Sequence, residues 1–298
     1  MSLSSNAGTG NRSGSSNDAT VLLPAPGGPA TTQTGSIPVM APPISVQQDG
    51  GLAVVTIDHP PLNLYDEAMG TALVAALDEL ESITPRAVLF RFEGRIVTGG
   101  VDVSTFDALA DAEAASAMFA GLVSVAQRVA ALACPTVFAA HHTCLTWGFE
   151  LALACDLILA TDRASFGLVE ATVGLTPAMG GTQRLAERAG SGRAREFVMT
   201  ADRYDAATMH AWGVVNRVLP VEGFDEAARA FARKLADGPT VAHAATKKVI
   251  AAYLEGGVAQ ADADVPSIAG PLFDTSDLRG AIRTFLTEGP GHAVFEGR

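Results

Sequence analysis

The sequence predicts an α/β fold in which strands and helices alternate, followed by a C-terminal segment that is entirely helical. Short runs of aliphatic and β-branched residues alternate with segments in which apolar residues recur at helical spacing. Beyond Pro220 only the helical spacing continues. Such alternation implies right-handed βαβ units that share one largely buried sheet.

The individual elements follow from these two periodicities. Strands are predicted over Leu52–Ile57, Ala87–Phe92, Thr136–Ala140 and Leu157–Ala160. The helices between them are indicated by two apolar series, Met69, Leu73, Leu77, Leu80 and Met118, Leu122, Val125, Val129. A polar turn at 141–143 ends the third strand, and a short helix is expected to begin near Trp147 or Gly148. The C-terminal helices are predicted by the series Phe224, Ala228, Phe231, Leu235 and over residues 239–256 and 276–287.

Three regions are therefore expected: a disordered tail over 1–48, an α/β core over 49–220 and a helical segment over 221–298. The first region carries only Arg12 and Asp18 as charges and is rich in Ser, Gly, Asn, Thr and Pro. It has too little apolar surface to offset the entropy cost of ordering. A spacer is favoured over a partner-binding tail, and the composition is not that of a secretory signal or transit peptide.

The charge balance excludes some classes of function. The chain has 20 basic and 32 acidic residues, a net charge of -12 and a pI of about 4.9. This argues against a nucleic-acid partner bound through a broad basic face and against adsorption to an anionic membrane. Three cysteines, Cys134, Cys144 and Cys155, are too few for a disulfide framework and lie in apolar stretches. We therefore expect reduced core cysteines and a cytoplasmic location.

Two glutamates are the leading candidates for chemistry. Glu150 is expected in the first turn of a helix, where a carboxylate is also stabilised simply by the helix dipole. Glu170 lies in an apolar loop, where a buried carboxyl group is costly unless it is paired. Both follow predicted strands, at the edge where open α/β sheets bind ligands. The pair therefore predicts an acid–base site, although the dipole alone could explain Glu150.

A backbone oxyanion hole is a second candidate feature. Gly99 and Gly100 follow the second predicted strand and could form either a tight turn or a loop that approaches a ligand closely. An N–H group there and another at the helix start, near Trp147, could converge on one oxygen. Two such donors would stabilise negative charge that develops on that oxygen.

Several motifs resemble the enoyl-CoA hydratase/isomerase (crotonase) family. The stretches that carry the resemblance are Glu150–Leu157, Ala164–Glu170 and Gly174–Leu185, the last with a specific Gly-Gly-Thr-Gln-Arg-Leu run. Further matches are Thr98–Asp102, Trp212–Asn216 and Leu272–Asp277. The resemblance implies a crotonase-like spiral of ββα units with a C-terminal helical trimerisation segment. The ligand would be an acyl-CoA thioester, with coenzyme A as part of the substrate and no separate cofactor.

The resemblance also implies roles for individual residues. Glu150 and Glu170 would be the catalytic carboxylates of a hydratase-like lyase, Glu150 activating water and Glu170 protonating the α-carbon. The N–H groups of Gly99 and Trp147 would form the oxyanion hole. The substrate would contact a set of residues in one loop and one C-terminal aromatic residue, namely Gly99, Gly100, Val101, Asp102 and Phe273. The assembly would be a homotrimer or a hexamer built as a dimer of trimers.

The chain departs from the family at Thr146-Trp147-Gly148, where relatives carry glycines. The indole of Trp147 is expected either to pack in the core or to narrow the acyl pocket. The family's C-terminal lysine motif is missing, so the phosphates of coenzyme A would need other groups. The candidates are Lys247, Lys248, Arg91, Arg95 and a helix N-terminus. An isomerase that needs only Glu170, another acyl-CoA-processing enzyme and a non-catalytic CoA-binding protein remain alternatives. No metal site is expected, because adjacent His141 and His142 would point to opposite faces of a strand.

Overall fold

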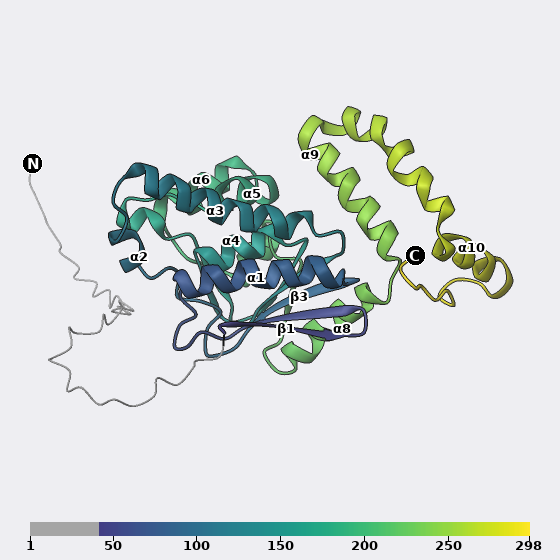
Figure 1. Cartoon of the computed structure of the whole chain (residues 1–298), viewed down its shortest axis with the longest axis horizontal. Helices are drawn as coiled ribbons and strands as arrows, with labels where there is room; N and C mark the ends of the chain where they lie inside the picture. Colours follow the sequence, from purple (N-terminus) through teal and green to yellow (C-terminus); the bar gives the residue numbers. More distant parts are fainter. Residues whose placement is uncertain (1–41) are drawn as a thin grey trace, which may run out of the picture. The chain divides into compact units, whose positions relative to one another are not determined.

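A computed structural model of the chain describes residues 42–298 (Figure 1). The tail prediction for residues 1–41 lies outside the described residues. The prediction that the tail extends to residue 48 was wrong, because Ile44–Asp49 forms strand β1. β1 pairs antiparallel with β2 (Leu52–Ile57) through a tight turn at Gly50 and Gly51, where Gly50 has a φ of 58°. Most residues of this strand are polar, so composition alone groups it with the polar segment that precedes it.

Within the described residues, six strands form one sheet in the order β1-β2-β3-β4-β6-β9. All neighbours after β1 and β2 pair in parallel. The remaining strands of this sheet are β3 (Ala87–Phe92), β4 (Thr136–Ala140), β6 (Leu157–Thr161) and β9 (Arg217–Leu219). The four strands predicted from the sequence are confirmed, and only β6 is longer than expected, by one residue.

A second, three-stranded sheet in the described part of the chain turns the alternation into a spiral. Its strands are β5 (Thr143–Leu145), β7 (Ser165–Gly167) and β8 (Tyr204–Asp205). β5 follows β4 directly, and β7 follows β6, so the chain repeatedly forms a longer strand, a short strand and then helical structure. The helical elements that follow are α4 (Trp147–Ala154), η1 (Glu170–Val173), α5 (Gly181–Ala189), α6 (Ser191–Thr200) and α7 (Ala206–Ala211). The expected spiral of ββα units is confirmed.

Helices cover both faces of the larger sheet (Figure 1). One face packs against α1 (Glu67–Ile83) and α3 (Ala112–Ala131), the two helices predicted from apolar spacing. The short helix α2 (Ser104–Asp107) precedes α3. The other face packs against α8 (Phe224–Ala236), whose buried residues contact buried residues of β2, β3 and β4. Residue 220 is therefore not a boundary of the core, because α8 completes the second layer.

The rest of the C-terminal segment consists of α9 (Thr240–Ala269), η2 (Gly270–Asp274) and α10 (Ser276–Glu288). α9 changes direction at Gly257, which has a φ of 73°, close to the end predicted at residue 256. Lys247 joins α9 to the core through an ion pair of 2.8 Å with Asp156. Large apolar side chains stay exposed on these elements, namely Val241, Ile250, Tyr253, Leu254, Val258, Val265, Phe273, Ile282, Phe285 and Leu286.

α3 is the one described helix whose length and composition would allow it to cross a membrane. Four of its residues, Leu122, Val125, Ala126 and Val129, are instead buried in the core. Its last turn carries Arg128, which forms ion pairs with Asp78 and Glu81 of α1. The three cysteines are free and buried, as predicted.

Candidate active site

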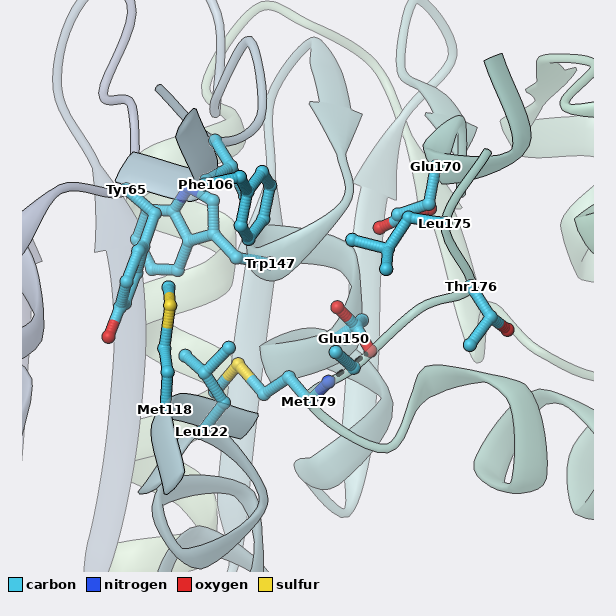
Figure 2. A pocket seen from close by; sticks show the side chains of 12 residues that line it. Tyr65, Phe106, Met118, Leu122, Trp147, Glu150, Glu170, Leu175, Thr176 and Met179 are labelled. Carbon is cyan, nitrogen blue, oxygen red and sulfur yellow. Dashed lines mark hydrogen bonds between the residues drawn. The ribbon is translucent and has the colours of Figure 1, made fainter. Parts of the chain in front are cut away.

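Glu150 and Glu170 line the same cavity, although they come from different ββα units (Figure 2). Glu150 lies in the first turn of α4 and Glu170 begins η1. Their residues are only 3% and 8% exposed. The other lining side chains are mostly apolar, namely Tyr65, Val101, Phe106, Met118, Leu122, Trp147, Leu175, Thr176, Ala178 and Met179. Two carboxyl groups therefore share a site from which bulk water is largely excluded.

The backbone around 179–181 holds the carboxylate of Glu150. Oε1 accepts hydrogen bonds from the N–H groups of Met179 at 2.8 Å and Gly181 at 2.9 Å. A Cβ atom on Gly181 would lie 2.7 Å from Cγ of Glu150, so only glycine allows this approach. These two donors were not predicted from the sequence. The Gly-Gly pair inside the Gly174–Leu185 motif was the available signal that a backbone approaches another group closely.

The environment separates the acidities of the two carboxyl groups. Burial raises the pKa of Glu150 to about 7, against the opposing effect of the N–H groups of Gly181 and Met179. Burial and then the nearby charge of Glu150 raise the pKa of Glu170 to about 8. Oε2 of Glu170 is buried and accepts no hydrogen bond from the described residues. Both carboxyl groups therefore keep their protons to a higher pH than a free glutamate does, and the charge of ionised Glu150 opposes the ionisation of Glu170.

In the loop after β3, the N–H of Gly99, which the resemblance implied as a donor to substrate, is already used within the protein. The N–H of Gly99 is already donated to the carbonyl oxygen of Leu62 at 2.9 Å. The N–H groups of Gly100 and Asp102 are also used, by Thr98 Oγ1 and by the carbonyl of Tyr65, both at 2.9 Å. Gly99 is therefore not a free donor.

Val101 and Trp147 supply the free N–H groups. Neither N–H forms a hydrogen bond with any residue in 42–298. Trp147 is the first residue of α4, where a backbone N–H has no partner inside the helix. Both residues line the cavity with the two glutamates. Of the two N–H groups predicted from the sequence, that of Trp147 is free and that of Gly99 is not, and Val101 offers the free N–H of the loop.

The indole of Trp147 both packs in the core and forms part of the cavity wall. The residue is 1% exposed. Nε1 donates to Thr98 Oγ1 at 2.9 Å and is 3.2 Å from the carbonyl oxygen of Asn63. The ring centroid lies 6.0 Å from that of Tyr65 and 5.7 Å from that of Phe92. Packing of the indole in the core, one of the two alternatives expected from the sequence, is confirmed, and the same ring also lines the cavity.

The candidates for recognising coenzyme A lie outside this cavity. Phe273 is 61% exposed in η2 and does not line the cavity within one chain. Lys247 is paired with Asp156, and Arg91 is paired with Glu93 and Asp225, so their charges are neutralised locally. Lys248 and Arg95 form no ion pair with any residue in the described range.

His141 and His142 are engaged separately. His141 Nε2 lies 3.1 Å from the carbonyl oxygen of Gly94, and His142 Nδ1 lies 3.2 Å from Thr143 Oγ1. The described residues contain no cluster of three His, Cys, Asp or Glu side chains that could hold a metal ion.

Comparison with known proteins adds independent information. The profile of the family described as enoyl-CoA hydratase/isomerase matches residues 47–292. The chain is 33% identical over 209 residues to a Mycobacterium avium protein named "Probable enoyl-CoA hydratase echA17", covering 70% of this chain and 81% of that one. It is 27% identical over 245 residues to "Probable enoyl-CoA hydratase echA8" of Mycobacterium bovis, covering 82% and 94%. Its structure resembles that of an enoyl-CoA hydratase from Bacillus anthracis, with a TM-score of 0.79, 25% identity and coverage of 86% and 100%.

Proposed function

Because the chain belongs to the enoyl-CoA hydratase/isomerase family, we propose that it adds water to the α,β double bond of an enoyl-CoA thioester and catalyses the reverse dehydration. The observation that carries this proposal is the pair Glu150 and Glu170 in one mostly apolar cavity. Hydration needs a base for water and an acid for carbon. Two carboxyl groups with separated pKa values can divide these tasks.

The first contribution of the protein is electrostatic. The free N–H groups of Val101 and Trp147 would donate to the thioester carbonyl oxygen. They would stabilise the negative charge that develops there as the hydroxyl group adds to the β-carbon. Loss of one such donor costs about 3–4 kcal/mol of transition-state stabilisation in a well-studied protease, so a pair is a large effect.

The second contribution is the movement of protons. Ionised Glu150 accepts a proton from water, and the hydroxide oxygen forms its bond to the β-carbon. The π electrons move to the α-carbon and the carbonyl oxygen, and the α-carbon then takes the proton of Glu170. The product is a 3-hydroxyacyl thioester, and dehydration reverses each step. The raised pKa values, about 7 for Glu150 and about 8 for Glu170, favour this division near neutral pH.

Separate substitutions of the two glutamates test the proposal. Glu150→Gln and Glu170→Gln should each lower kcat for hydration of crotonyl-CoA by at least about 100-fold, as expected for the loss of a general acid or base. The assay monitors hydration through the loss of ultraviolet absorbance of the conjugated thioester. Full activity of both variants would refute the proposal.

The same variants distinguish the alternative functions. An isomerase would keep its activity in Glu150→Gln and lose it in Glu170→Gln, because one carboxylate suffices to shuttle a proton between carbons. Product analysis by chromatography separates the shifted double bond from the hydroxyl product. A non-catalytic protein would bind acyl-CoA thioesters tightly and turn over none of them.

We also propose that copies of the chain assemble through the C-terminal helices into a trimer or a dimer of trimers. The support is the set of large exposed apolar side chains on α9 and α10. In such an assembly the exposed ring of Phe273 would contact the adenine of coenzyme A bound to a neighbouring subunit. The reaction would take place in the cytoplasm. Coenzyme A would be part of the substrate, and no further cofactor would be needed. Light scattering of the full chain measures the mass of the assembly.

A further inference from the structure

We propose that the fixed indole of Trp147 limits the length of the acyl cavity and restricts the enzyme to short enoyl-CoA thioesters of crotonyl size. This inference rests on the proposed function and adds the class of substrate. Figure 2 shows the indole beside Tyr65, Phe106 and Met118 on one side of the cavity. Glu150 and Glu170 lie on the other side. An acyl group whose carbonyl oxygen lies at the N–H groups of Val101 and Trp147, and whose reacting carbons lie at the carboxyl groups, must share this cavity with the indole.

The space in the cavity is small. Its free volume is about 20 Å³, which accommodates about one water molecule. An acyl group can enter only if lining side chains move. The number of carbons that the cavity accepts is therefore set by the lining side chains that cannot move.

Trp147 is such a fixed side chain. Nε1 donates to Thr98 Oγ1 at 2.9 Å, and the ring packs against Tyr65 and Phe92. The hydroxyl of Thr98 also accepts the N–H of Gly100 at 2.9 Å. If the indole swung aside, a buried N–H would lose its acceptor and the loop that carries Val101 would lose support. Rotation of the Trp147 side chain would therefore also disturb the loop that carries the proposed oxyanion donor Val101.

Met118 is the contrasting side chain. It is unbranched and partly exposed, and together with Tyr65 and Leu122 it also lines an outer groove between α1 and α3. Met118 therefore marks the alternative to a closed cavity. An enzyme that accepts long acyl chains would have to pass them beside Met118 into that groove. If Trp147 limits the cavity, short acyl chains are preferred. If Met118 opens a way into the groove, long acyl chains are accepted as well.

The test measures kcat/KM of the full chain on enoyl-CoA thioesters with acyl chains of increasing length, from crotonyl to decenoyl. One misfitting methylene group in an apolar pocket lowers kcat/KM by about 10- to 200-fold. The wild type should therefore prefer crotonyl-CoA over octenoyl-CoA by at least about tenfold. Trp147→Leu should raise the ratio of octenoyl to crotonyl turnover by a similar factor.

Trp212→Leu is the matched control, because it makes the same change at the other tryptophan. The ring of Trp212 packs on Tyr204 with centroids 4.8 Å apart and does not line the cavity. This variant should keep the wild-type chain-length profile. Trp147→Phe keeps an aromatic ring at the site and should give a profile between those of the wild type and Trp147→Leu.

Three results would overturn the inference. The first is equal kcat/KM of the wild type on crotonyl-CoA and decenoyl-CoA, which needs no variant to fold. The second is a folded Trp147→Leu variant with the wild-type profile, and the third is admission of long chains by Met118→Ala but not by Trp147→Leu. Failure of the proposed function is distinguishable, because then no thioester is hydrated. Calorimetric binding of butyryl-CoA against octanoyl-CoA would still measure the length of the cavity, and equal affinity would again overturn the inference.

Discussion

Replacing Gly181 by alanine tests whether the backbone at 179–181 controls the ionisation of Glu150. The new Cβ would lie 2.7 Å from Cγ and 3.1 Å from Oε1 of Glu150. A contact below 3.0 Å is one that real Cβ atoms essentially never make. The carboxylate must therefore move away from at least one of the N–H groups of Met179 and Gly181, now at 2.8 and 2.9 Å.

The magnitude follows from the hydrogen bonds that would be lost. A hydrogen bond to a charged group contributes about 1.5–3 kcal/mol, and one pKa unit corresponds to about 1.4 kcal/mol. Loss of one bond would raise the pKa of Glu150 by about one to two units above its present value. The carboxylate must be ionised to activate water, so kcat/KM at pH 7 should fall by about 5- to 50-fold from a starting pKa of about 7. The acidic limb of the pH profile should move to higher pH.

The assay is the pH dependence of crotonyl-CoA hydration, combined with thermal unfolding to show that the variant is folded. Gly192→Ala is the matched control, because a Cβ atom on Gly192 would meet no heavy atom within 4 Å. It should leave both kcat/KM and the acidic limb unchanged. A folded Gly181→Ala variant with wild-type kcat/KM and an unmoved acidic limb would refute the reasoning.

Three further predictions concern the same residues. The wild type should show a bell-shaped pH profile with limbs near pH 7 and pH 8, because Glu150 must be ionised and Glu170 protonated; a rate that keeps rising above pH 8 would contradict this. Both pKa values are raised above the usual value of 4.5. The stability that the protonated groups contribute is therefore fully present below pH 4.5 and is lost as the pH rises through about 7 and about 8. The combined Glu150→Gln and Glu170→Gln variant should therefore melt at a higher temperature than the wild type above pH 8 but not at acidic pH, and equal melting temperatures at both would exclude this effect. Thr146→Gly should increase the free energy of unfolding in urea by about 1 kcal/mol, because Thr146 has a φ of 45° and a buried hydroxyl without a hydrogen bond; a destabilised variant would show that no strain is stored there.

The elements with strong periodicity were predictable, and the short ones were not. β2, β3 and β4 have the predicted ends, because uninterrupted apolar runs specify strands buried on both faces. β5 and β7 have only three residues each, too few for a pattern to be recognised. β1 alternates polar and apolar residues at the end of a polar segment, and its partner strand, not its own composition, makes it a strand.

The candidate site was likewise predictable only in part from the sequence. The sequence identifies Glu150 and Glu170, because a carboxyl group in an apolar segment is costly unless it is used. It cannot tell which N–H of the 98–102 loop is free, because that depends on whether the carbonyl groups of Leu62 and Tyr65 reach Gly99 and Asp102. The donors to Glu150 likewise come from a distant turn.

The sequence by itself determined the alternation of strands and helices, the two acidic groups and the unusual tryptophan, because each depends on residue type and local spacing. Only the tertiary structure decided which amide groups stay unpaired, how the two carboxyl groups differ in acidity and where the indole points. These properties arise from contacts between segments far apart in the chain. Their energies depend on distance, burial and direction, which residue types alone do not specify.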